Sequence, residues 1–552
     1  MEIGEDAWQW QTKEMVWSAV AIAMSCLVLT IWEVLWWKPQ RIRSAFKKQG
    51  IDGPIPSFLS GNLSEVQRMQ SQYSKLTSPT STSFSDQWFC SLFPYLQQWR
   101  KQYGPTYLYS IGNRLHLYVG DPETIKELNL TRSLDLGKPS YLTKPLKPML
   151  GDGIIRANGQ HWSFQRNLIA PQFFLSKIQK MVDYMEESTK EIIRKWERII
   201  IENGGKVAEI VIDDDLKALT ADVISKASFS SSYAQGNQIF SKLAALQAVL
   251  AKPNLLFGFL NLRFFPTKEN REIWRLEQEV EKLILKVVSD RKLENQRYGN
   301  ENQKDLLQLI IDSSANAKNQ SGSGIMKKLR HKHETKKLIV DMCKNIYFAG
   351  SESTAVLVTW TLVLLAFHPE WQDRLRSEIS NTFSDMSPHC FRDADNFRKL
   401  KQLTMVIQES LRLYSPGITT SREALEEMKL GELVVPKGTN IWILTPAMHR
   451  DKEIWGEDAS EFKPERFEGG VSEACKYPQA YLPFGLGSRI CAGQHFALTE
   501  AKIVLSLLLS SFSFSISPNY RHCPSYRMVL VPKYGAPVLV TKLEDEILQI
   551  KQ

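Results

Sequence analysis

The most informative segment of this 552-residue chain is Phe484-Gly485-Leu486-Gly487-Ser488-Arg489-Ile490-Cys491-Ala492-Gly493. Pro483 and the glycines favour a tight, irregular backbone, and the apolar pattern that follows predicts a helix over 496–509. Cys491 therefore lies just before a helix N-terminus, where free N–H groups and the helix dipole favour a thiolate. A lone cysteine is more often a small buried apolar residue, so the spacing around it has to decide its role.

That spacing, Phe-x-x-Gly-x-Arg-x-Cys-x-Gly, resembles the haem-binding signature of the cytochrome P-450 superfamily at every fixed position. The resemblance extends from the N-terminal segment to about residue 540. It implies a mainly α-helical fold with small β-sheets and haem b (iron protoporphyrin IX) as the cofactor. It also implies that Cys491 is the proximal ligand of the haem iron and that its electron donation favours O–O cleavage. Phe484, Arg489 and Gly493 are then cofactor-binding residues.

Two other segments carry residues that the resemblance assigns to the haem propionates. In one of them Trp162 and Arg166 stand one helical turn apart, within Gln160-His161-Trp162-Ser163-Phe164-Gln165-Arg166. Such a pair by itself indicates cation–π packing at the surface, whereas the resemblance implies that both side chains donate to a propionate. Arg422, six residues after Pro416, matches another propionate-binding arginine less specifically. With Arg489, these residues provide three cations for two carboxylates.

Glu409-Ser410-Leu411-Arg412 lies on an amphipathic segment, where positions three apart share a helix face. Taken alone, Glu409 and Arg412 predict a surface ion pair worth less than about 1 kcal/mol. The resemblance implies instead a buried pair that is joined by Arg466 from a later loop. These three residues are then scaffold for the cysteine loop and are not catalytic.

The segment Ala349-Gly350-Ser351-Glu352-Ser353-Thr354 interrupts an apolar helix that is predicted over 335–367. Gly350 and the hydroxyls can loosen the backbone hydrogen bonds and open a pocket for O2 and water. In isolation, a polar notch in a core helix is the commoner interpretation. The resemblance implies that Glu352 acts with Ser353 or Thr354 to relay protons during O–O cleavage. Ser353 stands where the family usually has threonine, so which alcohol faces oxygen stays open at this point.

The composition is that of a globular protein. Apolar residues make up 43% and charged residues 23%, which excludes wholesale disorder, collagen and coiled coil. The formal charge of +9 is small for this length, and we expect no nucleic-acid partner. The seven cysteines are scattered, without a C-x-x-C pair. This excludes a disulfide scaffold or structural zinc module and suits a reducing compartment.

The N-terminal segment predicts a membrane anchor. No charge occurs from Met15 to Trp32 and apolar residues continue to Trp37, which is long enough to cross a bilayer. Acidic residues precede this span and basic residues follow it, so the rest of the chain is expected in the cytosol. Together with the anchor, the resemblance implies the endoplasmic reticulum membrane. The predicted layout is a lumenal segment 1–14, a transmembrane helix 15–37, a basic and Pro/Gly-rich hinge 38–60 and a haem-thiolate catalytic domain 61–552.

Periodicity beyond the hinge is mainly helical. Apolar residues recur every three or four positions at 176–203, 275–291, 335–367 and 396–413. Short runs rich in β-forming residues lie at 105–119, 429–443 and 528–541. A low-complexity, lysine-rich segment at 318–337 predicts a solvated surface loop in preference to a docking patch.

The function that the resemblance implies is monooxygenation. The chain has no flavin or nicotinamide fingerprint, so electrons are expected from a membrane NADPH–cytochrome reductase, and NADPH is not bound by this chain. Leu136-Gly137-Lys138-Pro139 and Leu150-Gly151-Asp152-Gly153-Ile154 resemble the plant clan that oxidises isoprenoids, and within it the branch with gibberellin and pentacyclic triterpenoid oxidases. The expected substrate is a terpenoid acid. Substrate contacts are implied near 140–158, 235–262, 345–350, 416–421 and 525–530.

Two functions from other classes remain open. One is a haem-thiolate isomerase or dehydratase that acts on hydroperoxides without O2 or reductase, against which the acid–alcohol pair argues. The other is a membrane-anchored interaction protein without catalysis, against which the full set of ligand and propionate residues argues.

Overall fold

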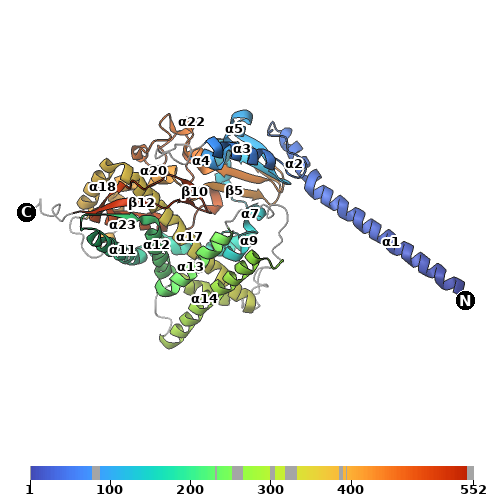
Figure 1. Ribbon diagram of the computed structural model, residues 1–552, viewed down its shortest axis with the longest axis horizontal. Helices are drawn as coiled ribbons and strands as arrows, with labels where there is room; N and C mark the ends of the chain where they lie inside the picture. The colour runs from blue at the N-terminus through green and yellow to red at the C-terminus, as the bar shows by residue number, and fades with distance from the viewer. Residues whose placement is uncertain are drawn as a thin grey trace, which may run out of the picture.

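One long helix, α17 (Lys332–Phe367), runs through the middle of the molecule (Figure 1). The computed structural model describes residues 2–76, 88–229, 233–250, 265–298, 305–316, 332–383, 390–392 and 394–543. Residues 355–366 of α17 are all buried, as expected for a helix that is apolar on every side. The helix contacts α12 (Ile212–Phe229), α20 (Lys401–Leu413) and α23 (Gln494–Ser511), and this bundle forms the centre of the core.

The remaining helices surround this centre. The longer ones are α3 (Leu63–Leu76), α5 (Pro94–Tyr103), α6 (Pro122–Leu130), α9 (Gly159–Ile169), α11 (Val182–Glu202), α13 (Tyr233–Leu250), α14 (Lys268–Tyr298), α15 (Leu306–Asn316) and α18 (Pro369–Thr382). The shorter ones are α4 (Trp88–Leu92), α7 (Ser140–Thr143), α8 (Lys147–Leu150), α10 (Leu175–Ile178), α19 (Ala394–Lys399), α21 (Thr445–His449) and α22 (Lys452–Trp455). Helix was correctly predicted in all four periodic segments, although the chain between α19 and α20 is interrupted at Leu400.

The strands form four small sheets. The largest has the order β1-β2-β8-β5-β3, in which only β2 and β8 are parallel, and the second has the order β4-β12-β9. Two hairpins, β6-β7 and β10-β11, complete the set within the described residues. The bounds are β1 (Thr106–Ile111), β2 (Arg114–Val119), β3 (Leu136–Gly137), β4 (Val207–Val211), β5 (Thr419–Ala424), β6 (Met428–Leu430), β7 (Leu433–Val435), β8 (Asn440–Leu444), β9 (Phe512–Ile516), β10 (Pro524–Tyr526), β11 (Leu530–Pro532) and β12 (Pro537–Lys542). The prediction of a mainly α-helical fold with small β-sheets is confirmed.

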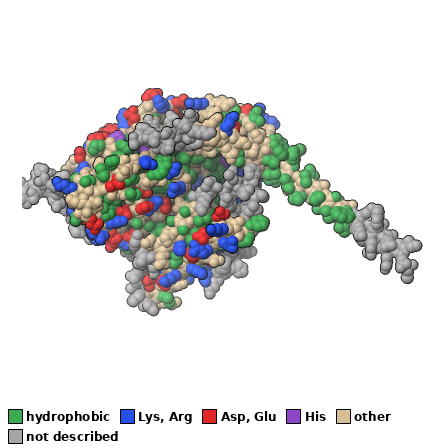
Figure 2. Space-filling model, viewed as in Figure 1, with side chains coloured by type: hydrophobic (Ala, Val, Ile, Leu, Met, Phe, Trp, Pro, Cys, Tyr) green, Lys and Arg blue, Asp and Glu red, His purple; other side chains and the backbone are tan. Residues whose placement is uncertain are grey.

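The N-terminal helix α1 (Glu2–Trp32) projects away from the rest of the molecule (Figure 1), and hydrophobic side chains cover most of its described surface (Figure 2). It continues through a π-helical stretch (Glu33–Trp37) into α2 (Lys38–Lys47). The most apolar 18-residue stretch within Met15–Lys47 has a mean hydropathy of 2.0, and none of it is buried. Both properties are typical of a membrane-spanning helix. The second helix of sufficient length and hydropathy is Thr335–Phe367, which is 72% buried and belongs to the core.

The first part of the predicted hinge at 38–60 is helical, because Lys38–Lys47 form α2. The Pro/Gly stretch that follows is also held in place. Arg43 donates to the Gly53 carbonyl (2.8 Å), and a Cβ on Gly53 would lie 1.8 Å from the Leu108 carbonyl oxygen of β1. Only glycine permits this approach, so the Pro/Gly segment is fixed along the sheet.

Most of the lysine-rich segment at 318–337 lies outside the described residues. Its last part, residues 332–337, forms the first turns of α17. Lys337 Nζ is 3.3 Å from the carboxylate of Asp152. The prediction of a surface loop is therefore wrong for residues 332–337.

Candidate active site

The cysteine loop has the tight geometry that its glycines predict. Cys491 N–H donates to the Phe484 carbonyl (2.9 Å), and α23 begins three residues later at Gln494. Gly487 has a φ of +66°, and a Cβ there would lie 3.1 Å from the Leu128 carbonyl oxygen. Its N–H donates to Asn129 Oδ1 (2.8 Å). The loop is thus folded around a glycine that no other residue replaces without strain.

Cys491 opens into a cavity of about 450 Å³, a volume typical of cofactor and ligand sites (about 300–1,000 Å³). The cavity wall contains nine residues predicted for the site: Trp162, Arg166, Ser353, Thr354, Arg422, Phe484, Arg489, Cys491 and Gly493. The apolar part of the wall includes Ile154, Ile155, Ile169, Phe173, Ile224, Ile346, Leu357 and Phe496. Five segments far apart in the sequence therefore meet at one apolar cavity with a thiol and several cations.

The Cys491 thiol is accessible from the cavity but is otherwise surrounded by protein. Burial raises the pKa of the thiol, and the opposing effects of the Gly493 N–H and the Arg166 charge are smaller. The N–H at the helix start thus favours the thiolate in the predicted direction, but desolvation has the larger effect in the protein without a bound cation. A bound metal cation would supply the positive charge that stabilises the thiolate. A Cβ on Gly493 would meet no atom within 4 Å, so there is open space beside the thiol for a ligand.

Arg489 and Arg166 are held at the cavity wall by hydrogen bonds to protein oxygens. Arg489 donates to the Ala157 carbonyl (3.0 Å) and to Asn158 Oδ1 (2.9 Å), and its guanidinium lies 4.5 Å from the centre of the Trp162 ring. Arg166 donates to the Ile490 carbonyl (2.7 Å), next to the thiol. Burial, with a contribution from the charge of Arg422, lowers the pKa of Arg489 to about 10.

Arg422 approaches the same cavity from β5. It donates to the carbonyls of Ser421 and Leu486 (both 3.0 Å), so it also braces the cysteine loop. Burial lowers its pKa to about 10. Lys138, which follows β3, is a fourth cation in the wall. Burial and the charges of Arg422 and Arg489 lower its pKa to about 7.

Sequence reasoning missed Lys138 as a site residue. The available signal was a lysine between Gly137 and Pro139. In the part of the chain that the structure describes, no acidic side chain forms an ion pair with Lys138, Arg166, Arg422 or Arg489. A cationic end without acids, apolar walls and a thiol beside open space fit haem b, whose two carboxylates would supply the missing negative charge.

Helix α17 passes the cavity without a break, so the predicted interruption at 349–354 is wrong. The hydroxyls of Ser351 and Ser353 donate to the carbonyls four residues earlier, Tyr347 and Ala349 (both 2.8 Å), and thereby satisfy themselves within the helix. Gly350 has a packing role, because a Cβ there would lie 2.5 Å from Ile224 of α12. The two helices can approach so closely only because residue 350 is glycine.

The predicted acid–alcohol group is divided by the helix. Both alcohols line the cavity, but Ser353 is partly exposed there, whereas Thr354 is buried and lies beside Glu500 of α23. Burial raises the pKa of Glu500 well above its ordinary range, and its oxygens form no hydrogen bond of normal geometry among the described residues. Glu352 does not line the cavity. Burial raises the pKa of Glu352, and the charge of Lys217 lowers it by a smaller amount.

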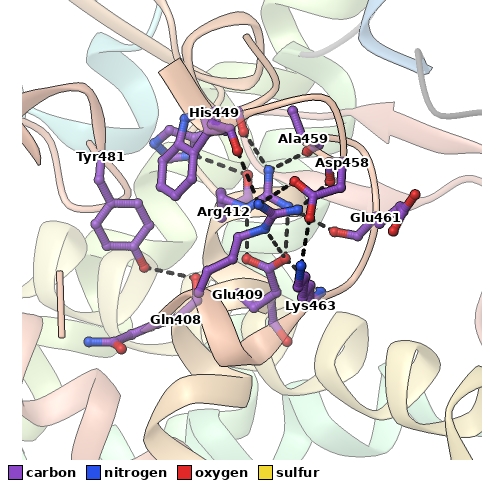
Figure 3. Close-up of polar contacts among 12 residues, drawn as sticks. Gln408, Glu409, Arg412, His449, Asp458, Ala459, Glu461, Lys463 and Tyr481 are labelled. Carbon is purple, nitrogen blue, oxygen red and sulfur yellow. Dashed lines mark hydrogen bonds and ion pairs between the residues drawn. The ribbon is translucent and has the colours of Figure 1, made fainter. Parts of the chain in front are cut away.

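Glu409 and Arg412 are fully buried, each 0% exposed. Figure 3 shows their side chains pointing toward each other. Two hydrogen bonds of 2.7 Å join their forked side chains. Arg412 also donates to the carbonyls of His449 (2.6 Å), Ala459 and Glu461 (2.9 Å), and Lys463 N–H donates to Glu409 (2.9 Å). The surface ion pair that the two residues alone would predict is therefore excluded.

Arg466 completes this buried network, as predicted. Its Nε lies 3.5 Å from Glu409 Oε1, and its Nη1 lies 2.6 Å from the Asp458 carboxylate. Sequence reasoning missed His449, which accepts from Leu482 N–H at Nε2 (2.8 Å) and donates from Nδ1 to the Arg412 carbonyl (3.0 Å). Burial lowers its pKa to about 3, so the ring is neutral. His449 links the network to the segment that leads into the cysteine loop.

The implied substrate segments meet the cavity unequally. Residues of 140–158, 345–350 and 416–421 line the wall. The described residues of 235–262 and 525–530 do not, and residues 251–262 lie outside the described part of the chain.

Comparison with known proteins adds the family context. The family model described as Cytochrome P450 matches residues 87–540. Cytochrome P450 714A2 of Arabidopsis thaliana is 44% identical over 504 residues, which cover 91% of this chain and 93% of that protein. Cytochrome P450 714C2 of Oryza sativa subsp. japonica is 44% identical over 524 residues, covering 94% and 97%. Cytochrome P450 714B3 of Zea mays is 40% identical over 525 residues, covering 94% of each.

Proposed function

This chain belongs to the cytochrome P450 family, and on that premise we propose that it is a membrane-bound monooxygenase that oxidises a terpenoid acid. Its family and fold class were predicted correctly from the sequence, and haem b is its cofactor. When bound, haem b supplies the chemistry of O2 activation, with electrons from a partner protein. The overall reaction is R–H + O2 + NADPH + H⁺ → R–OH + H2O + NADP⁺, or epoxidation of an alkene.

The observation that carries the residue assignments is the meeting of a thiol, four cations and a helix alcohol in one apolar cavity. We assign Cys491 as the iron ligand, and Phe484 and Gly493 as residues that border the ring. Trp162, Arg166, Arg422 and Arg489 are assigned to the propionates; the last three are cations with no acidic partner among the described residues. Glu409, Arg412 and Arg466 hold the loop that presents Cys491.

Ser353 is the alcohol that we assign to the oxygen side of the cavity. Its Oγ donates to the Ala349 carbonyl at the cavity wall, and rotation about one side-chain bond would turn it toward the cavity. Glu352 holds a proton more tightly than an exposed carboxyl because burial raises its pKa, so it is suited to resupply Ser353. Thr354 faces Glu500 and is assigned a supporting role.

Replacing each alcohol distinguishes these two assignments. In Ser353→Ala, product formation per NADPH consumed should fall by about 100-fold, since a positioned proton donor contributes roughly 10²–10⁴. Ser353→Thr should retain coupling, and Thr354→Val should lose less than Ser353→Ala. The measurement is product and hydrogen peroxide formed per NADPH. The reverse ranking of the two alcohols would assign the role to Thr354.

The terpenoid assignment is supported by the apolar wall and by the isoprenoid-oxidase segments. The segment Leu150–Ile154 ends at the cavity, where Ile154 and the following Ile155 line the wall. Hydrogen bonds from α17 hold the backbone of this segment in place. Asn345 donates to the Leu150 carbonyl (2.6 Å) and accepts from Ile155 N–H (3.0 Å). Such a fixed, apolar surface suits a rigid polycyclic substrate, whose burial is driven by the hydrophobic effect.

The predicted layout remains part of the proposal: a lumenal segment 1–14, an anchor 15–37 and a cytosolic catalytic domain on the endoplasmic reticulum membrane. The unburied apolar helix supports the anchor. The proposed electron donor is a membrane NADPH–cytochrome reductase. Expression of the full chain and of a chain lacking residues 2–37, followed by fractionation and microscopy with an endoplasmic reticulum marker, tests this layout. Loss of the marker overlap only in the shortened chain is expected.

The direct test of function is co-expression of the chain with a plant NADPH–cytochrome reductase in microsomes. Gibberellin-type diterpenoid acids and pentacyclic triterpene acids are supplied separately under ¹⁸O2. We expect NADPH-dependent products that carry one ¹⁸O per hydroxylation, and none with Cys491→Ser. If neither acid class gives an oxidised product, the terpenoid assignment is wrong. Turnover of hydroperoxides without NADPH would instead identify an isomerase or dehydratase.

A further inference from the structure

Lys138 is a cation in the cavity wall to which the assignments above give no role. It directly follows β3, where Gly137 pairs with Glu423 and Leu136 pairs with Ala424. Continuation of this antiparallel register places Lys138 opposite Arg422, the residue that precedes Glu423 on β5. Two cations thus stand at neighbouring positions on the same edge of the sheet.

Asn158 fixes the backbone of Lys138 and links it to Arg489. Asn158 Oδ1 accepts from Lys138 N–H (2.7 Å) and from the Arg489 guanidinium (2.9 Å), and Asn158 Nδ2 donates to the Lys138 carbonyl (3.1 Å). The position of Lys138 in the wall is therefore set by tertiary contacts. It does not depend on the flexible end of its side chain.

The charge of Lys138 is uncompensated. Glu423, the acid next to Arg422 on β5, accepts from Ser140 N–H (2.8 Å) and forms no ion pair with Lys138. The three arginines of the wall each donate hydrogen bonds to protein oxygens: Arg166, Arg422 and Arg489. In contrast, the Lys138 ammonium has no hydrogen-bond or ion-pair partner among the described residues. A half-buried ammonium with three free donors and like charges around it is suited to bind an anion.

We propose that the Lys138 ammonium binds a carboxylate at the cationic end of the cavity, from either a haem propionate or the terpenoid acid substrate. The carboxylate would bridge Lys138 to Arg422 or Arg489 and relieve the repulsion among them. The substrate alternative rests on the proposed function, whereas the propionate alternative requires only the family assignment. The two sources make different predictions.

The experiment compares Lys138→Met, which removes the charge at similar length, with Lys138→Arg, which keeps it. Lys429→Met is the matched control, because Lys429 is an exposed lysine on β6 outside the cavity wall. The holoproteins are titrated with oleanolic acid, ent-kaurenoic acid and their methyl esters, and the substrate-induced shift of the haem absorption band gives Kd. In parallel, the rate of haem transfer to apomyoglobin is measured.

If the substrate supplies the carboxylate, Lys138→Met weakens acid binding by about tenfold or more and leaves ester binding unchanged. If a propionate supplies it, Lys138→Met loses haem about tenfold faster, and acid and ester Kd values change alike. Lys138→Arg should stay near wild type in either case, and so should Lys429→Met. If Lys138→Met changes neither acid selectivity nor haem loss by more than twofold, or if Lys138→Arg fails equally, the proposal is wrong.

Failure of the proposed function has a different appearance. Wild-type protein would then bind neither the acids nor the esters, while the haem-transfer assay would still show whether Lys138 holds a carboxylate.

Discussion

Two clusters of arginines differ in how their charge is balanced: one surrounds Glu409, and the other lines the cavity. In the first, Glu409 and Arg412 form a forked pair, and Arg466 adds Asp458 to it. At the cavity, Arg422 is buried and Arg489 is half-buried, and neither has an acidic partner in the described part of the structure. One cluster is complete within the protein, and the other is complete only with an anion.

This difference separates stability from binding. A buried ion pair whose remaining donors and acceptors are satisfied holds its surroundings in one geometry, but removal of one partner leaves an uncompensated charge. An unpaired buried cation lowers the free energy of unfolding. A bound anion removes this penalty, so the penalty contributes to the affinity for the anion. Arg412 is thus expected to matter for folding and Arg422 for the cofactor.

The largest expected effect is on folding, from Arg412→Leu. It leaves the Glu409 carboxylate buried without its partner and should lower the free energy of unfolding by about 3–5 kcal/mol. We expect little or no folded holoprotein, measured by the yield of the ferrous–carbon monoxide spectrum and by chemical denaturation. The double variant Glu409→Met/Arg412→Leu removes both charges and should recover part of the loss. A stable Arg412→Leu protein would show that the Glu409–Arg412 network is not required for folding.

Arg422→Met tests the second half. It removes hydrogen bonds to Ser421 and Leu486 but also relieves repulsion with Lys138 and Arg489. Haem affinity should fall by about 1.5–3 kcal/mol, the value of hydrogen bonds to charged groups, which is roughly tenfold to a hundredfold. Haem transfer to apomyoglobin measures this. The unfolding free energy should fall less than in Arg412→Leu; an equal loss would show that both clusters are structural.

The pH dependence of stability sharpens the comparison further, through His449. Burial lowers its pKa from the ordinary 6.5 to about 3, so between these values the unfolded state binds more protons than the folded state. Stability should therefore fall as pH drops from about 6.5, by about 1–2 kcal/mol between pH 7 and pH 5 from this residue. His449→Gln keeps one donor and one acceptor and should flatten the melting temperature against pH.

Part of the slope should persist in His449→Gln, because burial also lowers the pKa of His116 to about 3 and of His522 to about 4. An unchanged slope would show that His449 titrates normally in the folded protein.

The smallest expected effect is that of an exposed pair. Lys437 and Glu426 are 2.7 Å apart, but their side chains are 60% and 61% exposed. Lys437→Met should change the free energy of unfolding by less than about 0.5 kcal/mol, because solvent screens the pair. Urea denaturation beside Arg412→Leu provides the scale. A loss of more than about 1 kcal/mol of unfolding free energy would contradict this expectation. Burial would then not explain the difference between the exposed Lys437–Glu426 pair and the buried Glu409–Arg412 pair.

What could be predicted from the sequence depends on local spacing. The cysteine loop, the Trp162–Arg166 pair and the forked pair of Glu409 and Arg412 are each carried by residues within one loop or one helical turn. Their geometry follows from chain connectivity and helix periodicity, so the sequence alone places them near one another. The apolar anchor and the alternation of helical segments are local patterns of the same kind.

Only the tertiary structure decided which groups from distant segments meet. His449 forms hydrogen bonds to Leu482 and Arg412. Lys138 lies near the like charges of Arg422 and Arg489, and Glu500 lies beside Thr354. Gly350 looked like a break in a helix but is required by the approach of Ile224. The sequence by itself determined the family and singled out Cys491 and Arg489 as candidate site residues, because short-range spacing carries those features. Burial and charge balance are sums over neighbours from the whole chain, so the thiol's raised pKa and the unpaired Lys138 became visible only once the chain had folded.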